Sequence, residues 1–292
     1  MVALNYYDNK VVLVVGASDG LGLSIVTLLT RFSSARIIAT SRSLIKIEER
    51  LSKLNGKNAK GVGLNLESSD EEISEVVRKI IAAESRLDVL INCAGMGFRG
   101  KVADTRMSVH RRVFQVDYFG QIAVIKSVMN HNASSPLHIV QVSSVQGYFG
   151  VGERAPYSAA KHALVGFIDS LRTECDPYPT NESGGSNTIV TLVSPGYINT
   201  NHSASAVTGS GTVYSKSDES TLNGYSPEFV AQQLLLKSAA KHREIIIADA
   251  KITFLVKLRY LCANLCFRIL RNRQIGKKES LWKTIFKWIF ST

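Results

Sequence analysis

The chain has few cysteines and no apolar run near its start. Its 292 residues include four cysteines, which lack the Cys-x-x-Cys spacing of a metal or redox site and the density of a disulfide-rich secreted domain. We therefore expect reduced thiols in an intracellular protein, and no metal site. The first residues, Met-Val-Ala-Leu-Asn-Tyr-Tyr-Asp, lack the apolar stretch of a signal peptide or membrane anchor, and we expect neither there.

Acidic residues are almost missing from the last part of the chain. Residues 251–292 contain ten lysines and arginines and one acid, Glu279, so they carry nine of the eleven net positive charges. The remainder of the chain is nearly neutral. A charge excess confined to one segment indicates an interaction tail, and because no nucleic-acid reading motif accompanies it, we expect no nucleic-acid partner.

Apolar, β-branched runs alternate with helical patterns along residues 1–250. We predict strands near 11–15, 36–40, 60–66, 87–92, 137–143, 188–194 and 244–248, and helices near 20–32, 44–54, 70–84, 107–132, 155–174 and 227–240. This alternation predicts a single α/β domain over 1–250, a Rossmann-type doubly wound parallel sheet, followed by a basic amphipathic helical tail over 251–292. Ligands of such sheets bind beyond the carboxyl ends of the strands.

A glycine-rich turn follows the first predicted strand. Lys10-Val-Val-Leu-Val-Val leads directly into Gly16-Ala-Ser-Asp-Gly-Leu-Gly22 and then into a helix. Glycines permit a tight turn and close approach of the backbone, and a helix N-terminus offers free N–H groups to a pyrophosphate. The turn therefore predicts a nucleotide site, and two further motifs after strands, Asn92-Cys-Ala-Gly95 and Ser194-Pro-Gly-Tyr-Ile-Asn-Thr200, fall at the same edge of the sheet.

Tyr157 and Lys161 form a candidate acid/base pair. Positions four apart share one face of a helix, so the lysine ammonium lies beside the phenol. A nearby cation favours the phenolate and lowers the pKa of tyrosine, which suits a general acid or base. Alone, this spacing is also common on ordinary helix surfaces. Ser144, thirteen positions upstream of Tyr157, adds a hydroxyl that can bond to a carbonyl oxygen.

These motifs, in this order, resemble the classical short-chain dehydrogenase/reductase family over roughly residues 10 to 250. The stretch Tyr157-Ser-Ala-Ala-Lys-His-Ala-Leu-Val-Gly-Phe is most similar to the membrane-associated retinoid- and steroid-like branch that includes dehydrogenase/reductase member seven. The resemblance implies an oxidoreductase that interconverts a carbonyl and an alcohol on a lipophilic small molecule, such as a retinoid, steroid or other lipid, with hydride from a nicotinamide cofactor. We also expect a homodimer.

The resemblance also implies roles for particular residues. Tyr157 exchanges a proton with the substrate oxygen, Lys161 lowers the Tyr157 pKa and holds the nicotinamide ribose, and Ser144, in preference to Ser143, bonds to the developing oxyanion. The cofactor-binding residues that it implies are Gly16, Ser18, Gly20, Leu21 and Gly22 at the pyrophosphate, Asn65, Asn92 and Gly95 on the adenosine side, and Ile198 and Thr200 at the carboxamide.

The end of the second predicted strand favours NADP(H) over NAD(H). An acid there would bind the ribose hydroxyls, but this chain has Ser41 and Arg42, and a guanidinium suits a 2′-phosphate. The alternative is that Arg42 is a solvated arginine at the start of a helix. The chain departs from the family at Val15 (usually threonine), at Asn65 (usually an acid) and at Asp117 (usually asparagine). The resemblance places Asp117 among the catalytic residues, where the family's asparagine holds the water of the proton relay. Its carboxylate could accept that water's proton but could not donate as an amide does, and it would oppose the effect of Lys161 on Tyr157.

Two segments outside these motifs carry further expectations. Residues 201–226, rich in serine, threonine and glycine, have the polarity of a mobile lid or of a plain loop. In the tail, 252–270 is apolar but interrupted by charges, and Leu281-Trp-Lys-Thr-Ile-Phe-Lys-Trp-Ile-Phe sets aromatic and basic residues on different faces. We expect peripheral contact with the cytoplasmic side of a membrane, at the endoplasmic reticulum or a lipid droplet. The alternative is packing on the enzyme body or on a second subunit.

Three functions remain open at this point. The first is an NADP(H)-dependent oxidoreductase, which an intact set of Ser144, Tyr157 and Lys161 favours. The second is a catalytically weak nucleotide-binding scaffold at a membrane. The third is an NAD-dependent alcohol dehydrogenase, against which the Ser41-Arg42 pair argues.

Overall fold

The computed structural model describes residues 4–54, 58–133, 135–175 and 188–274. The strands are β1 Val11–Val15, β2 Arg36–Ser41, β3 Ala59–Gly63, β4 Val89–Asn92, β5 Phe98–Arg99, β6 Leu137–Val142, β7 Thr188–Pro195, β8 Val207–Thr208 and β9 Glu244–Ile247. The α-helices are α1 Gly20–Phe32, α2 Leu44–Ser52, α3 Asp70–Glu84, α4 Met107–Phe114, α5 Gly120–His131, α6 Ala155–Cys175, α7 Glu219–Leu222, α8 Pro227–Ala239, α9 Ala250–Leu261 and α10 Ala263–Gln274. Short 3₁₀ turns lie at Asn5–Tyr7 and Val145–Gly147.

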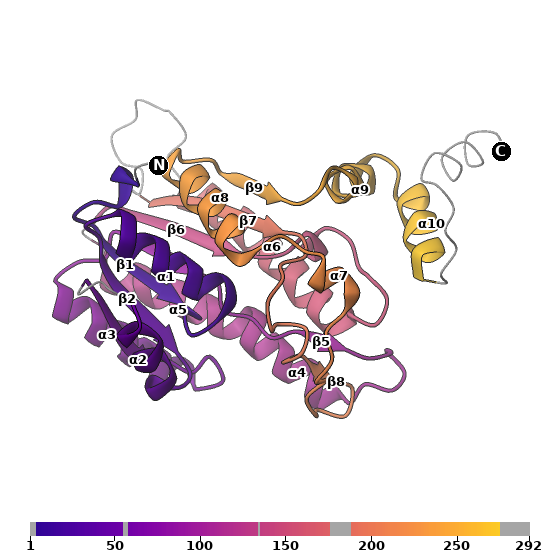
Figure 1. The fold of residues 1–292 in the computed structure, drawn as a ribbon, viewed down its shortest axis with the longest axis horizontal. Helices are drawn as coiled ribbons and strands as arrows, with labels where there is room; N and C mark the ends of the chain where they lie inside the picture. Colours follow the sequence, from indigo (N-terminus) through magenta and orange to yellow (C-terminus); the bar gives the residue numbers. More distant parts are fainter. Residues whose placement is uncertain (1–3, 55–57, 134, 176–187, 275–292) are drawn as a thin grey trace.

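One parallel sheet organises the chain (Figure 1). Within the described residues it has seven strands in the order β3-β2-β1-β4-β6-β7-β9, so the predicted doubly wound sheet is confirmed. The strand order reverses between β1 and β4, and in such sheets the crevice beyond that reversal is the usual ligand site. A second, two-stranded parallel sheet joins β5 to β8, which sequence patterning did not predict.

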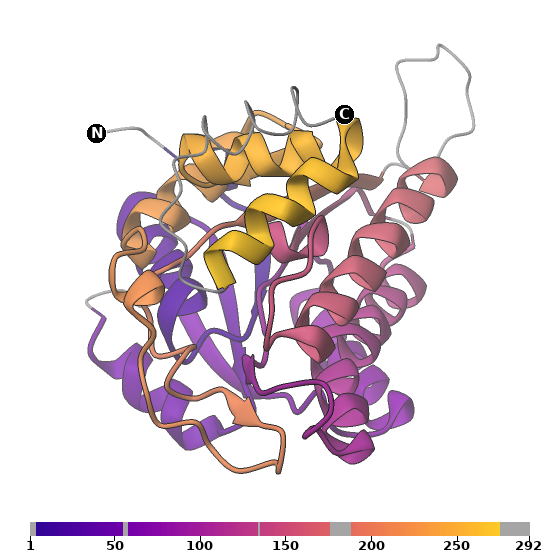
Figure 2. The ribbon, with the colours of Figure 1, turned by 90° about the vertical axis from the view of Figure 1, so that its right-hand side faces the viewer.

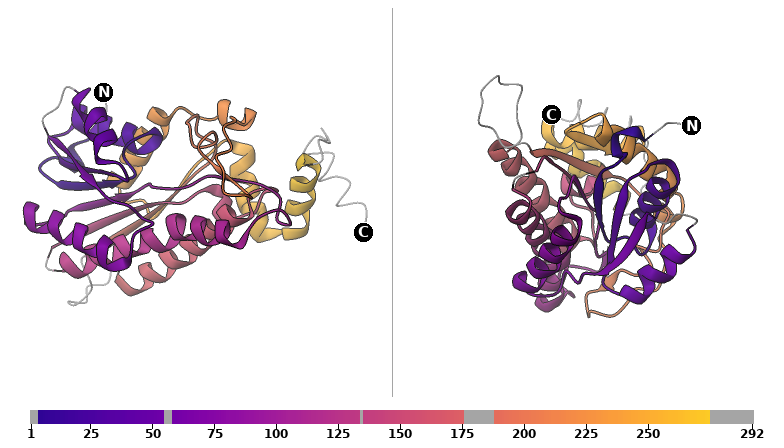
Figure 3. Two further views of the ribbon diagram at one scale, coloured as in Figure 1. Left: turned by 90° about the horizontal axis from the view of Figure 1, so that it is seen from below. Right: turned by 90° about the vertical axis from the view of Figure 1, so that its left-hand side faces the viewer.

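Helices cover both faces of the sheet, as Figure 3 shows from below. The strand β1 is buried along its whole length and alternates between two cores, as a strand between two layers must. Val12 and Val14 pack with α1, α2 and α8, whereas Leu13 and Val15 pack with α3, α5 and α6.

The helix predicted over 107–132 is interrupted. It consists of α4, one π-helical turn over Gln115–Phe119 and α5, and the N–H of Gly120 donates to the carbonyl of Gln115, five residues earlier. A Cβ atom on Gly120 would lie 2.5 Å from the carbonyl oxygen of Leu66, so only glycine permits this approach. Turns of this type occur often at functional sites, and this one contains Asp117.

The segment after β9 packs on the domain with one side only. The inner side of α9 buries Ile252, Leu255, Val256 and Leu258 in the core shared with α6, and α10 adds Leu265 and Cys266. Figure 2 views the carboxyl edge of the sheet, with α10 crossing in front and α9 beside it. The amphipathic stretch Leu281-Trp-Lys-Thr-Ile-Phe-Lys-Trp-Ile-Phe lies outside the described residues.

Candidate active site

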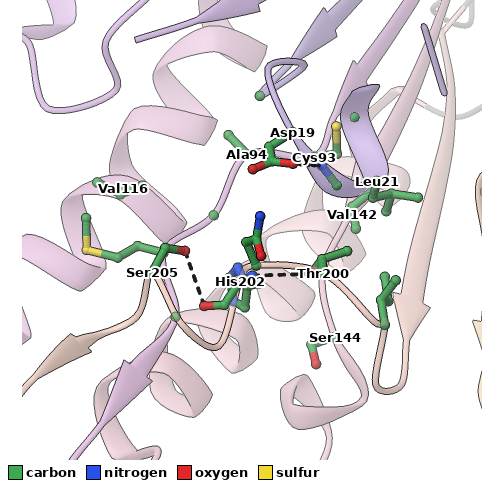
Figure 4. Close-up of a pocket in the computed structure, with 18 of the residues that line it drawn as sticks. Asp19, Leu21, Cys93, Ala94, Val116, Val142, Ser144, Thr200, His202 and Ser205 are labelled. Carbon is green, nitrogen blue, oxygen red and sulfur yellow. Dashed lines mark hydrogen bonds between the residues drawn. The ribbon is translucent and has the colours of Figure 1, made fainter. Parts of the chain in front are cut away.

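A cavity of about 470 Å³ opens at the carboxyl ends of the strands (Figure 4). It collects thirteen of the fifteen residues that the sequence analysis assigned to catalysis or cofactor binding, which come from segments that are far apart along the chain. They are Gly16, Ser18, Gly20, Leu21, Gly22, Arg42, Asn65, Gly95, Ser144, Tyr157, Lys161, Ile198 and Thr200. The other two, Asn92 and Asp117, are fully buried behind the cavity wall.

The glycine turn forms a cradle in which side chains would collide. Gly16 has φ +83°, and a Cβ there would lie 2.6 Å from the Cα of Ala94. A Cβ on Gly22 would lie 2.2 Å from the carbonyl oxygen of Gly16. Asp19 caps α1 by accepting a hydrogen bond from the Gly20 N–H at 2.8 Å. The first turn of α1 therefore borders the cavity with its positive end, which fits the pyrophosphate of a dinucleotide.

The helix α6 presents Tyr157 and Lys161 to the cavity. The Lys161 ammonium is almost fully buried and lies 5.7 Å from the centroid of the Tyr157 ring. Ser144 follows β6, and its Oγ accepts a hydrogen bond from the Gln146 N–H at 3.2 Å. The neighbouring hydroxyl of Ser143 instead donates to the carbonyl oxygen of Lys161 at 3.3 Å, so it is engaged with the backbone of α6.

The pKa of Tyr157 is shifted upward, not downward as Lys161 alone would require. Burial of the phenol is the main cause, and the Asp117 carboxylate adds to it, whereas the hydroxyl of Ser144 and the guanidinium of Arg99 act in the opposite direction. Burial also lowers the pKa of Lys161. The difference from the sequence-based expectation arises because low-dielectric surroundings disfavour both charged forms.

Asp117 lies in the π-helical turn and is fully buried. Its Oδ1 accepts a hydrogen bond from the Met96 N–H at 2.7 Å and lies 4.0 Å from the Lys161 Nζ. Its Oδ2 is buried and has no hydrogen-bond partner among the described residues. Burial raises the pKa of this carboxyl to about 6, against the opposing effects of Lys161 and of the Met96 N–H. The chain therefore keeps a titratable acid directly beside Lys161.

Asn92 supports the site from behind. Its Nδ2 donates to the carbonyl oxygen of Gln121 at 3.3 Å, which ties the end of β4 to α5. Asn65 lines the cavity, and its side-chain oxygen accepts from the Glu67 N–H at 3.1 Å, so it shapes the turn after β3.

Arg42 lies at the cavity rim with a carboxylate partner. Its Nη1 is 3.5 Å from Glu67 Oε1, and two thirds of the side chain is exposed. Glu67 is shared, because Arg112 Nη2 also reaches it at 3.0 Å. Near Arg42, Ser43 caps α2, and Lys46 lies 3.9 Å from the carboxylate of Asp19. The rim at this end of the cavity is therefore rich in donors and cations.

His202 is a cavity residue that the sequence analysis missed. Figure 4 shows it at the centre of the cavity, between Thr200 and Ser205. Its N–H donates to Thr200 Oγ1 at 3.3 Å, and its ring meets the Tyr157 ring at 61°, with centroids 5.9 Å apart. Burial, together with Lys161 and Arg99, lowers the pKa of His202 to about 4, so the ring is neutral at physiological pH. The only feature of the sequence that could have indicated His202 is its position two residues after Thr200, at the end of the Ser194–Thr200 motif.

A charged cluster joins the predicted lid to the domain and was also missed. One oxygen of Asp218, Oδ2, accepts from Arg99 at 2.7 Å, from Arg154 at 2.9 Å and from Ser203 at 3.0 Å. These donors come from β5, from the start of α6 and from the lid itself. The Arg99 side chain is only 9% exposed, so the contact is shielded from solvent. Such pairing between distant segments leaves no local pattern in the sequence.

Comparison with known proteins agrees with this geometry. Residues 10–210 match the family model described as short chain dehydrogenase. The chain is 37% identical over 276 residues to the Drosophila melanogaster "Dehydrogenase/reductase SDR family protein 7-like", covering 93% of this chain and 82% of that protein. It is 34% identical to the Xenopus laevis "Dehydrogenase/reductase SDR family member 7B", with 92% and 83% covered.

Solved structures share the fold. A short-chain dehydrogenase/reductase from Burkholderia phymatum in complex with NAD superposes with a TM-score of 0.73 at 18% identity, covering 89% of this chain and 96% of that one. A short chain dehydrogenase from Burkholderia cenocepacia in complex with NADP gives 0.72 at 19% identity, with 92% and 99% covered. With the cradle, the buried lysine and the tyrosine in one cavity, these matches show that the chain belongs to the short-chain dehydrogenase/reductase family, in the branch of member 7, whose fold binds NAD(P) and whose members are oxidoreductases acting on CH–OH groups.

Proposed function

We propose that this protein uses NADP(H) to interconvert a carbonyl and an alcohol on a lipophilic small molecule. The observation that carries the proposal is the meeting of Ser144, Tyr157 and Lys161 in the cavity that the glycine cradle borders. The bound nicotinamide nucleotide supplies or accepts the hydride.

The residues of the chain handle the proton and the oxygen. In reduction, the Tyr157 hydroxyl donates its proton to the carbonyl oxygen, and in oxidation the phenolate takes the proton from the alcohol. An upward-shifted pKa keeps Tyr157 protonated, which suits the donating role. The Ser144 hydroxyl donates a hydrogen bond to the same oxygen as charge develops on it. Lys161 stabilises the phenolate that remains after donation, and buried surroundings strengthen this attraction.

The preference for NADP(H) rests on the rim at the end of β2. Ser41 and Arg42 stand where a ribose-binding acid would otherwise lie, and Lys46 adds a second cation on the same side of the cavity. The Arg42 guanidinium lies 3.5 Å from the Glu67 carboxylate, so a 2′-phosphate would compete with Glu67 for it. Charge-assisted bonds to a phosphate favour that exchange.

The lipophilic nature of the substrate rests on the lid segment. Two of its apolar side chains are exposed: Val213 is 61% and Leu222 is 54% exposed. Leu222 follows Thr221, which lines the cavity. Apolar groups at a cavity mouth lose contact with water when they cover an apolar substrate.

The test is turnover of purified protein with NADPH and with NADH against lipophilic and small water-soluble carbonyls. We expect NADPH to support faster reduction and the lipophilic substrates to give the higher kcat/KM. Tyr157→Phe should lose at least about a thousandfold in kcat while the Kd for NADPH changes only a few-fold, because the hydroxyl acts mainly in the transition state. Retained turnover in Tyr157→Phe would refute the assignment of the proton donor.

A weakly catalytic nucleotide-binding scaffold is the second candidate. The Asp117 carboxylate favours it, because its charge makes the phenolate of Tyr157 harder to form. NADPH binding without turnover of any carbonyl or alcohol in the panel would support the scaffold and exclude the enzyme.

A further inference from the structure

The helices α9 and α10 expose large apolar side chains on their outer sides. On α9, Phe254 is 40%, Tyr260 72% and Leu261 84% exposed, and on α10 Phe267 is 46% exposed. Phe254 and Leu261 are seven positions apart, so they lie on the same side of α9, away from its buried side. In the described residues these two helices therefore carry a continuous series of solvated aromatic and aliphatic groups.

The same outer surface is basic. Residues 250–274 contain six lysines and arginines and no acid. Lys257 lies between Phe254 and Leu261 on α9, and Arg268 and Arg271 share an exposed face of α10 with Phe267. Three acids of the domain lie near these helices, and each already has a partner. Asp249 caps α9 by accepting from the Ile252 N–H, Asp169 pairs with Arg172, and Glu244 bonds to the hydroxyl of Tyr148.

This surface lies close to the cavity mouth. The helix α9 begins two residues after Ala248, which packs against Gly196 of the cavity wall. Figure 2 shows α10 on the same edge of the molecule as the lid segment. No helix in the described part of the chain is long and apolar enough to cross a membrane.

Two other occupants of this surface are disfavoured by charge. In a twofold dimer through α9 and α10, the same basic face would meet itself, so Lys257, Arg268 and Arg271 of one copy would face the same three cations of the other. The final residues, 275–292, contain four lysines and one acid, so they would also meet the surface with like charge. An anionic lipid headgroup layer supplies the opposite charge and accepts the apolar groups at its boundary.

We propose that the outer surface of α9 and α10, formed by Phe254, Lys257, Tyr260, Leu261, Phe267, Arg268 and Arg271, docks on an anionic bilayer without spanning it. The cavity mouth then lies near the membrane surface, from which a lipophilic substrate can be taken. This position gives the lipophilic substrate of the proposed function a route to the active site, although docking itself does not depend on catalysis.

The test is flotation of the full chain with vesicles of phosphatidylcholine alone or with 30% phosphatidylserine, at low and at physiological salt. We expect binding to the anionic vesicles that weakens as salt rises, because the ionic part is screened. Leu261→Ser and Phe267→Ser should each weaken binding about tenfold, and Lys257→Ser and Arg268→Ser about fivefold each. The matched controls are Ile45→Ser on α2, a residue that is 80% exposed, and Lys126→Ser on α5.

The outcomes separate docking from catalysis. Every variant should keep wild-type turnover of a water-soluble carbonyl without vesicles, since none of these side chains lines the cavity. Docking is refuted if the wild type ignores anionic vesicles, or if the α9 and α10 variants float like the controls. It is also refuted if light scattering shows that Leu261→Ser converts a dimer to a monomer, because a second copy would then cover the surface. A wild type that floats but turns over no substrate would refute the proposed function and leave docking intact.

Discussion

Replacing Asp117 by asparagine should remove a pH-dependent loss of stability. In the folded protein, burial raises the pKa of this carboxyl to about 6 from the model-compound value of 3.8. The folded chain thus binds the proton more tightly than the unfolded chain, so the free energy of unfolding falls as pH rises from about 4 to 6 and stays reduced above that range. With a pKa of 3.8 in the unfolded chain and about 6 in the folded one, the free energy of unfolding falls by about 1.4 kcal/mol between pH 5 and pH 8. Asp117→Asn has no carboxyl to titrate and should not show this loss.

Urea denaturation at pH 5, 6, 7 and 8 measures this difference. The wild type should become less stable relative to Asp117→Asn by about 1.4 kcal/mol across the series, with unchanged m-values. The attraction to Lys161, 4.0 Å away, acts only on the ionised carboxylate and is already contained in the pKa of about 6, so it adds no separate pH dependence. Asp104→Asn, at an exposed carboxylate, is the control. A constant difference between wild type and Asp117→Asn at every pH would refute the reasoning.

The same variant reports on catalysis. Because the Asp117 carboxylate raises the pKa of Tyr157, its replacement by an amide should raise kcat near neutral pH and move the pH–rate profile toward lower pH. If kcat falls instead, the acid has become part of the proton path from Lys161, and the profile of the wild type will show its apparent pKa.

Other positions give sharper or simpler outcomes. In fluorescence titrations, Arg42→Ala should weaken the binding of NADPH about thirtyfold and that of NADH less than threefold. Glu67→Gln removes the carboxylate that pairs with Arg42 and should therefore tighten NADPH binding. Equal effects on the two nucleotides would show that Arg42 does not bind the 2′-phosphate. Asp218→Ala should cost about 3 kcal/mol in thermal unfolding, because it leaves the shielded Arg99 guanidinium without a counter-charge, and it should speed proteolysis within 201–226. Unchanged proteolysis would exclude a role of Asp218 in fixing this segment. His202→Ala should lower kcat about tenfold without changing the Kd for NADPH, because the ring packs against Tyr157, the proposed proton donor. A change in Kd alone would place His202 at the cofactor instead.

Local patterns predicted the parts of the fold that depend on neighbours in sequence. The β-branched run of β1 and the glycine turn after it are fixed by strand burial and by φ values that only glycine adopts easily, so Gly16 could be placed from the sequence. Tyr157 and Lys161 could also be placed on one helix face, because residues four positions apart lie on the same side of an α-helix. The sheet then follows from the alternation of strands and helices, which the strand order confirms.

Contacts between distant segments could not be predicted in this way. Asp218 meets Arg99 across 119 positions, and nothing near either residue indicates the other. The sequence places Lys161 beside Tyr157, so the pKa of Tyr157 was expected to fall. The burial that raises this pKa instead depends on the whole fold and could not be predicted from the sequence. The π-helical turn was missed because the apolar pattern through 107–132 is also compatible with one unbroken helix.

The π-helical turn also changes how the side chains of α5 are oriented around the helix axis relative to those of α4. Each residue advances an α-helix by about 100°, so a turn with one residue more offsets every later side chain by that angle relative to the earlier ones. The face of α4 that packs on α6 and the face of α5 that packs on α3 are thereby set independently of each other. Deleting Val116 would bring the two helices back into one phase, and either the α3 contact or the direction of the Asp117 carboxylate toward Met96 would be lost. A shift of one residue in length here is therefore more disruptive than most substitutions of the same residues.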